Sequence, residues 1–116
     1  MAYKIIDNAH KIVYTMYMDS IDKEILDITQ EECAEVIVAI SKINRFGLDN
    51  FKPNKPLTNR QHLEEELGDL MAMINIVCDK GIASYANVEL AAHAKIKKLQ
   101  QWSNIFKETT DETQSK

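Results

Sequence analysis

The chain has 116 residues, of which 45% are apolar, and its formal net charge is −4. This length fits one domain with a small core, and the acidic balance argues against a nucleic-acid binder, which would carry a basic patch. We expect no signal peptide, and the longest apolar run, residues 70–78, is too short to span a bilayer. A cytoplasmic protein without a membrane partner is therefore expected. The cysteines, Cys33 and Cys78, are expected to be small buried thiols.

Four helices and no strands are predicted in chain order. The first covers about residues 5–18, where apolar side chains recur on one side. The second covers about residues 22–46, and Gly47 is well placed to cap its C-terminus. Residues 48–57 form a loop, since they contain two prolines and an Asp-Asn pair.

The third helix is expected to begin with a capping box formed by Thr58 and Gln61, and to end before Gly81. The fourth covers about residues 84–102. The polar residues 107–116 are expected to form a mobile tail after a domain of residues 1–106.

The third helix carries apolar residues on more than one side. A helix that is buried nearly all round lies at the centre of a larger structure. This pattern is consistent with a homo-oligomer, and a central helix in a compact monomer explains it equally well.

Two acidic clusters are the most informative feature of the sequence. Glu31, Glu32 and Glu35 lie three or four residues apart on the second helix, as do Glu66 and Asp69 on the third, so each set shares a helix face. Glu32, Glu66 and Asp69 also fall on otherwise apolar stripes, where an unpaired charge is costly. Antiparallel packing of the two helices would bring these acids together. Oxygen-only ligands favour Mg²⁺ or Mn²⁺.

Simpler interpretations of the same acids remain open. Residues 29–32 match a capping box, which would make Glu32 a helix-start residue. Residues 64–66 are acids that would complement the dipole of a helix N-terminus. Gly68 favours the metal site, because a glycine inside a helix costs about 1 kcal/mol relative to alanine and close approach of a helix or a ligand would explain it.

Two cations lie beyond the acids on the second helix. Lys42 is seven residues after Glu35, two turns along the same face, and Arg45 follows three residues later. Cations past a metal site suit a phosphate chain. The alternative is that they complement the dipole at the helix C-terminus.

The paired motif resembles that of the MazG-like all-α nucleoside triphosphate pyrophosphohydrolases. Its Glu-Glu-x-x-Glu half is residues 31–35, and its Glu-x-x-Asp half is residues 66–69. Residues 41–47 are also similar to the helix end of short, phage-type members, and the resemblance covers about residues 22–102. It implies a four-helix subunit that assembles as a dimer or a dimer of dimers. It also implies Mg²⁺-dependent cleavage, with Mn²⁺ as a substitute, of a nucleoside triphosphate to monophosphate and pyrophosphate.

The resemblance also implies roles for individual residues. By position, the metal ligands are Glu32, Glu35, Glu66 and Asp69. Glu31, the first acid of the motif, would support these ligands or orient water, and it joins Glu32 as a catalytic residue. The residues expected to meet substrate phosphates are Lys42, Arg45, Lys95 and Lys98.

The substrate is less closely defined than the reaction. Short phage-type relatives favour deoxynucleotides, so a dNTP is expected, with a slight preference for purines. The loop at residues 48–57 makes the gap between the motifs longer than is usual in the family, and we expect it near the substrate mouth. The alternatives are a non-catalytic helical interaction module, or a pyrophosphohydrolase acting on an alarmone or a phosphoribosyl-nucleotide.

Overall fold

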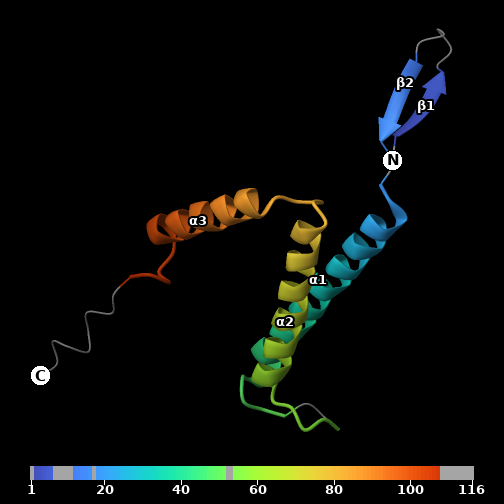
Figure 1. Ribbon diagram of the computed structural model, residues 1–116. Helices are drawn as coiled ribbons and strands as arrows, with labels where there is room; N and C mark the ends of the chain where they lie inside the picture. Colours follow the sequence, from blue (N-terminus) through green and yellow to red (C-terminus); the bar gives the residue numbers. More distant parts are fainter. Residues whose placement is uncertain (1, 7–11, 17, 52–53, 108–116) are drawn as a thin grey trace, which may run out of the picture. The chain divides into compact units, whose positions relative to one another are not determined.

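The computed structural model describes residues 2–6, 12–16, 18–51 and 54–107. Its elements are two strands, β1 (Ala2–Ile6) and β2 (Ile12–Met16), and three helices, α1 (Ser20–Phe46), α2 (Asn59–Asp79) and α3 (Tyr85–Trp102) (Figure 1). The chain divides into two compact units, Met1–Ile82 and Ala83–Lys116. The helical prediction is confirmed from Ser20 onward, whereas the expected count of four helices differs from the three in the described residues.

The prediction of a helix over residues 5–18 is wrong for the part that is described. β1 and β2 pair antiparallel, with Ala2 opposite Met16 and Ile6 opposite Ile12. Both strand segments are rich in β-branched and aromatic residues, which favour extended backbone over helix. Apolar residues at helical spacing were therefore a weaker signal than the residue types themselves.

α1 begins and ends at capping residues. Asp19 is its N-cap and accepts a hydrogen bond from the backbone N–H of Ile21 at 2.9 Å. At the other end the N–H of Gly47 donates to the carbonyl of Ile43 at 2.8 Å. Gly47 has φ of +91°, a value that favours glycine, so the predicted cap is confirmed.

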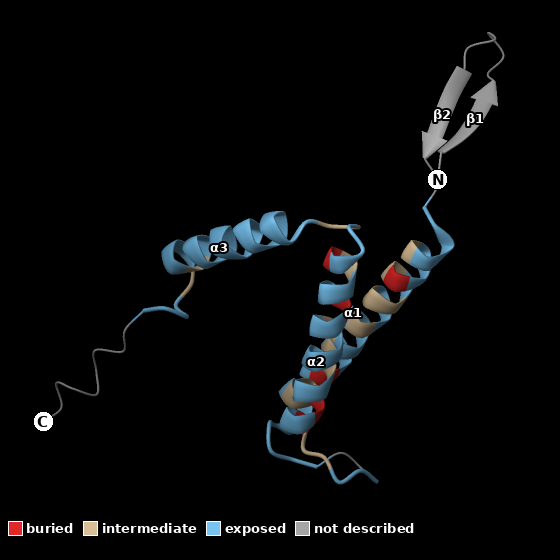
Figure 2. Ribbon diagram, viewed as in Figure 1, coloured by how far each residue is buried: buried red, intermediate tan, exposed pale blue. Residues whose placement is uncertain are grey.

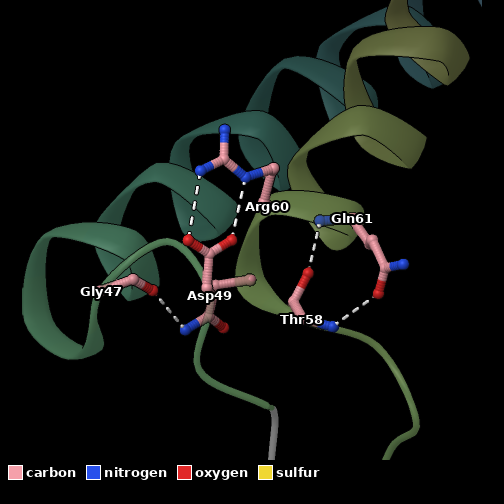
Figure 3. Close-up of polar contacts among 6 residues, drawn as sticks. Gly47, Asp49, Thr58, Arg60 and Gln61 are labelled. Carbon is pink, nitrogen blue, oxygen red and sulfur yellow. Dashed lines mark hydrogen bonds and ion pairs between the residues drawn. The ribbon is translucent and has the colours of Figure 1, made fainter.

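The loop after α1 is fastened to the start of α2 by a set of contacts that we call the loop clasp (Figure 3). The Asn59 side-chain amide donates to the Gly47 carbonyl at 2.9 Å. The Arg60 Nε and Nη2 atoms donate to the two carboxylate oxygens of Asp49 at 3.0 and 3.3 Å. The guanidinium of Arg60 lowers the pKa of the Asp49 carboxyl. The loop clasp holds the end of α1 close to the start of α2, so the chain reverses direction and α2 lies antiparallel beside α1 (Figure 1).

α2 has the predicted capping box and glycine end. The Thr58 hydroxyl accepts from the Gln61 N–H at 3.1 Å, while Gln61 Oε1 accepts from the Thr58 N–H at 2.9 Å. At the C-terminus Gly81, at φ +75°, donates its N–H to the Cys78 carbonyl, and the Ile82 N–H donates to Val77. This pair of bonds is a Schellman motif.

In the second unit, α3 is capped by Ser84, whose hydroxyl accepts from the Asn87 N–H at 3.3 Å. α3 therefore has the predicted bounds within one residue. The expected mobile tail, residues 107–116, lies outside the described residues except for Lys107.

Few side chains are buried where α1 and α2 pack together (Figure 2). The buried apolar residues among those described are Ile25, Ala39, Met73 and Cys78, and two polar residues, Asn59 and His62, join them. Cys33 is exposed, so its predicted burial is wrong, whereas that of Cys78 is confirmed. Much of the apolar surface of both helices is left in contact with solvent.

Candidate metal centre

The acidic clusters of α1 and α2 come together because the clasped loop makes the two helices antiparallel neighbours. Glu32, Glu66 and Asp69 each offer a carboxylate oxygen, and these oxygens lie within 4.8 Å of one another. Glu32 and Glu66 are partly buried, and Asp69 is exposed. Three of the four predicted metal ligands therefore meet at one point between the helices.

The spacing of these oxygens suits a small divalent cation. Two oxygens on one Mg²⁺ lie at most about 4.2 Å apart, because each Mg²⁺–O distance is about 2.1 Å. The carboxylate oxygens of the three residues lie up to 4.8 Å apart, so a small adjustment of the side chains brings them into that range. The donors are all carboxylate oxygens, and a donor set of this kind favours a hard cation over zinc or copper.

The electrostatics of the cluster favour a bound cation. The pKa of Glu32 is raised above its ordinary value of 4.5, first because the carboxyl is partly removed from water. The negative charges of Asp69, Glu66, Glu35 and Glu31, in decreasing order, raise it further. A cation at this point would be attracted by the same charges that repel one another without it.

The other two predicted acids of α1 lie outside the three-residue group. Glu31 and Glu35 are exposed, and Glu35 lies about 60° round the helix from Glu32, because successive residues are about 100° apart. Both still raise the pKa of Glu32 through their charges. Their roles at the site stay predictions.

His62, which was not among the site residues predicted from the sequence, contacts this centre. His62 Nε2 lies 3.0 Å from Glu66 Oε1, and the two side chains are only 10% and 14% exposed. The available signal was the four-residue spacing between them, which places both on one face of α2.

The predicted phosphate-binding cations occupy different settings. Lys42 is partly buried on α1, whereas Arg45 is exposed and its guanidinium carbon lies 4.7 Å from the centre of the Phe46 ring. This cation–π contact holds the guanidinium beside the end of α1. Lys95 and Lys98 are exposed on α3, in the second unit.

Gly68 has no close neighbour in the part of the chain that the structure describes. A Cβ atom added there would meet no side chain or other segment within 4 Å. Of the two explanations that the sequence left open, a helix or a ligand close to Gly68, the close approach of a helix is therefore not found among those residues. Its place between Glu66 and Asp69 leaves the backbone open beside the carboxylates.

Comparison with known protein families identifies the family to which the helical domain belongs. The model of the MazG nucleotide pyrophosphohydrolase domain matches residues 21–105. These residues include both acidic clusters, the whole of α2 and α3, and all of α1 except Ser20. The chain belongs to this family, and membership supports a nucleoside triphosphate pyrophosphohydrolase. No match was found among curated proteins or among solved structures.

Among the described residues, no helix combines the length and the apolar character that a membrane span needs.

Proposed function

We propose that this chain hydrolyses a nucleoside triphosphate to the monophosphate and pyrophosphate with the help of Mg²⁺. The observation that carries the proposal is the meeting of Glu32, Glu66 and Asp69 between α1 and α2 of a MazG domain. Their oxygens form an acidic centre that suits a hard cation, and a triphosphate is a substrate that such a cation binds.

Glu32, Glu66 and Asp69 hold the metal in this proposal. Glu35 joins them as the fourth ligand, because its exposed side chain is free to turn toward Glu32 from one helical turn along α1. When bound, Mg²⁺ polarises phosphate oxygens and lowers the pKa of a coordinated water.

The residues around the ligands position the reactants. Glu31 orients the water whose oxygen forms a bond to the α-phosphorus. The bond from that phosphorus to the bridging oxygen breaks, and pyrophosphate leaves. Lys42 and Arg45, which lie two to three turns beyond Glu35 on α1, stabilise the charge that develops on the leaving group. Lys95 and Lys98 contribute to binding the phosphate chain.

A dNTP is the proposed substrate, with a slight preference for a purine base. This choice rests on the similarity of residues 41–47 to short, phage-type members of the family. The loop at residues 48–57 follows α1 directly and is fastened by the loop clasp, which supports its place at the mouth of the site.

We also propose that the active form is a homo-oligomer, either a dimer or a dimer of dimers. The large apolar side chains that are at least 40% exposed on α1 and α2 are Ile21, Ile37, Val38, Ile40, Phe46, Leu67, Met71, Ile74 and Ile76. A surface of this kind marks a protein–protein contact.

Pyrophosphate release from a panel of dNTPs and NTPs, with and without Mg²⁺, tests the proposed reaction. We expect release only with the metal, and fastest with a purine dNTP. Glu32→Gln should lower kcat/KM by on the order of 10²-fold or more, because a charged group at the reacting centre is lost. Asp27→Asn is the matched control, since Asp27 is an exposed acid of α1 that pairs with Lys23 at 2.7 Å.

Melting curves complement the activity assay. A metal that binds only the folded state stabilises it by about 2.7 kcal/mol at a hundredfold excess over Kd. Release of pyrophosphate only from an alarmone or a phosphoribosyl-nucleotide would replace the proposed substrate. An unchanged Tm with Mg²⁺ and Mn²⁺, together with no turnover, would instead favour a non-catalytic interaction module.

A further inference from the structure

The contact between His62 and Glu66 lies at the edge of the carboxylate centre. Both residues belong to α2, one turn apart, and the distance from His62 Nε2 to Glu66 Oε1 is 3.0 Å. His62 is one of the few buried polar residues among those described, at 8% exposure. It is thus a contact shielded from water, unlike the exposed Lys23–Asp27 pair at the same spacing on α1.

The two atoms lie at a distance that suits a hydrogen bond. In such a bond a ring N–H donates and a carboxylate oxygen accepts, so Nε2 is the donor and Oε1 the acceptor. The second oxygen of Glu66 is left to face other partners. A glutamate side chain otherwise rotates about three bonds, and a buried donor at one oxygen restricts that freedom.

We propose that His62 is a positioning residue that holds the Glu66 carboxylate ready to share a divalent cation with Glu32 and Asp69. The inference rests on the proposed function for its metal, but not on the reaction. Hydrogen-bonded partners of ligating carboxylates orient the ligand, so the site does not have to order Glu66 when the cation arrives.

The competing explanation is that His62 only fills space between α1 and α2. Both explanations predict some loss of stability on mutation, so stability alone does not separate them. They differ in what they predict for a substitution that keeps a hydrogen-bond donor but changes the shape of the side chain. If His62 positions Glu66, such a variant keeps its metal affinity, whereas if His62 only fills space, it does not.

Mn²⁺ binding to the nucleotide-free protein, followed by the electron paramagnetic resonance signal of free Mn²⁺, is the decisive measurement. His62→Leu and His62→Asn lack a donor within reach of Glu66, and His62→Gln keeps one. We expect the first two to weaken Mn²⁺ binding by about 10–100-fold, the usual effect of losing such a partner. His62→Gln should recover most of that affinity. His93→Leu, a change of an exposed histidine of α3, is the matched control.

A second comparison tests whether His62 acts through Glu66. In a Glu66→Gln background the further change His62→Leu should cause little additional loss of Mn²⁺ affinity, because the two residues act as one unit. An undiminished additional loss would overturn the inference. Equal weakening by His62→Gln and His62→Leu would overturn it too, as would a folded His62→Leu protein with wild-type affinity. If neither His62→Leu nor His62→Asn folds while His62→Gln does, His62 serves the fold and the inference is wrong.

The outcomes separate this inference from the proposed function. Wild-type protein that binds Mn²⁺ in a His62-dependent way, but releases no pyrophosphate from any nucleotide, would refute the reaction and support the positioning role. If the wild-type protein hydrolyses nucleotides while His62→Leu leaves both Mn²⁺ affinity and kcat unchanged, the reaction is supported and the positioning role is refuted.

Discussion

Partial removal from water, and then the negative charges of Asp69 and Glu66, raise the pKa of the Glu32 carboxyl. The position of Glu32 on an apolar stripe of α1 predicted an inward-facing acid, and the side chain is partly buried beside Glu66 and Asp69. Helical spacing was sufficient for these three residues. It was not sufficient for Glu35, whose exposure depends on how α2 lies across α1. It did not reveal the buried His62–Glu66 contact either, because the burial of that pair depends on how the two helices pack.

The raised pKa of Glu32 predicts how the stability of the metal-free protein depends on pH. Because the native state keeps the Glu32 proton to higher pH than the unfolded state, whose pKa is near 4.5, unfolding releases a proton within that window. Stability therefore falls as pH rises from 4.5 through the raised value, and the penalty is fully present above it. Glu32→Gln should melt at nearly the wild-type temperature at pH 4 and above it at pH 7.

Thermal melting in the presence of a chelator, across this pH range, measures the difference. Mn²⁺ should reverse the order at pH 7, since only the wild-type protein gains the full stabilisation of the bound cation. A Glu32→Gln protein that is less stable than wild type at pH 7 without metal would show that Glu32 supports the fold directly.

At the scale of elements, the capping residues at helix ends were more informative than the periodicity of apolar residues. The ends of α1, α2 and α3 lie within two residues of their predicted positions because Gly47, the Thr58 capping box, Gly81 and Ser84 act locally. The N-terminal hairpin was missed because residues 5–18 were assigned by apolar spacing alone. The loop clasp lay beyond prediction, since it joins residues eleven and twelve positions apart through a turn whose course the sequence does not specify.

Asn59 should be the most sensitive residue of the loop clasp. It is 2% exposed, its side chain donates to the Gly47 carbonyl, and its N–H donates to the Asn50 carbonyl. Asn59→Ala removes the hydrogen bond between a buried side-chain amide and the Gly47 carbonyl, which costs about 0.5–1.5 kcal/mol of the free energy of unfolding. Urea denaturation followed by circular dichroism measures the loss.

Asp49→Asn is the comparison within the same clasp. The Asp49–Arg60 ion pair is solvent-exposed, with side chains 73% and 51% exposed, so its removal should change stability much less. If Asp49→Asn destabilises the protein as much as Asn59→Ala, the ion pair and not the buried amide holds the loop.

For the whole molecule, the main question is what covers the apolar surface. Ile37 and Met71 are 67% and 64% exposed, and each precedes by two residues a buried residue, Ala39 or Met73. Two residues correspond to about 200° round a helix, so Ile37 and Met71 lie opposite the seam between α1 and α2. The sequence indicated apolar residues on more than one side of the third predicted helix, and α2 shows the same distribution in the fold.

Met71→Glu should therefore dissociate the proposed homo-oligomer without breaking the seam between α1 and α2, because Met71 is turned away from it. We expect sedimentation velocity to show the wild-type protein as a dimer or tetramer, and Met71→Glu as a smaller species. The Tm of the wild-type protein should fall on dilution, since an oligomer that is linked to folding is stabilised by mass action. Glu65→Gln, a change of an exposed residue of α2, should leave the sedimentation unchanged. A wild-type protein that sediments as a monomer at every concentration, with a Tm independent of dilution, would show that no second copy covers this surface and would refute the oligomeric proposal.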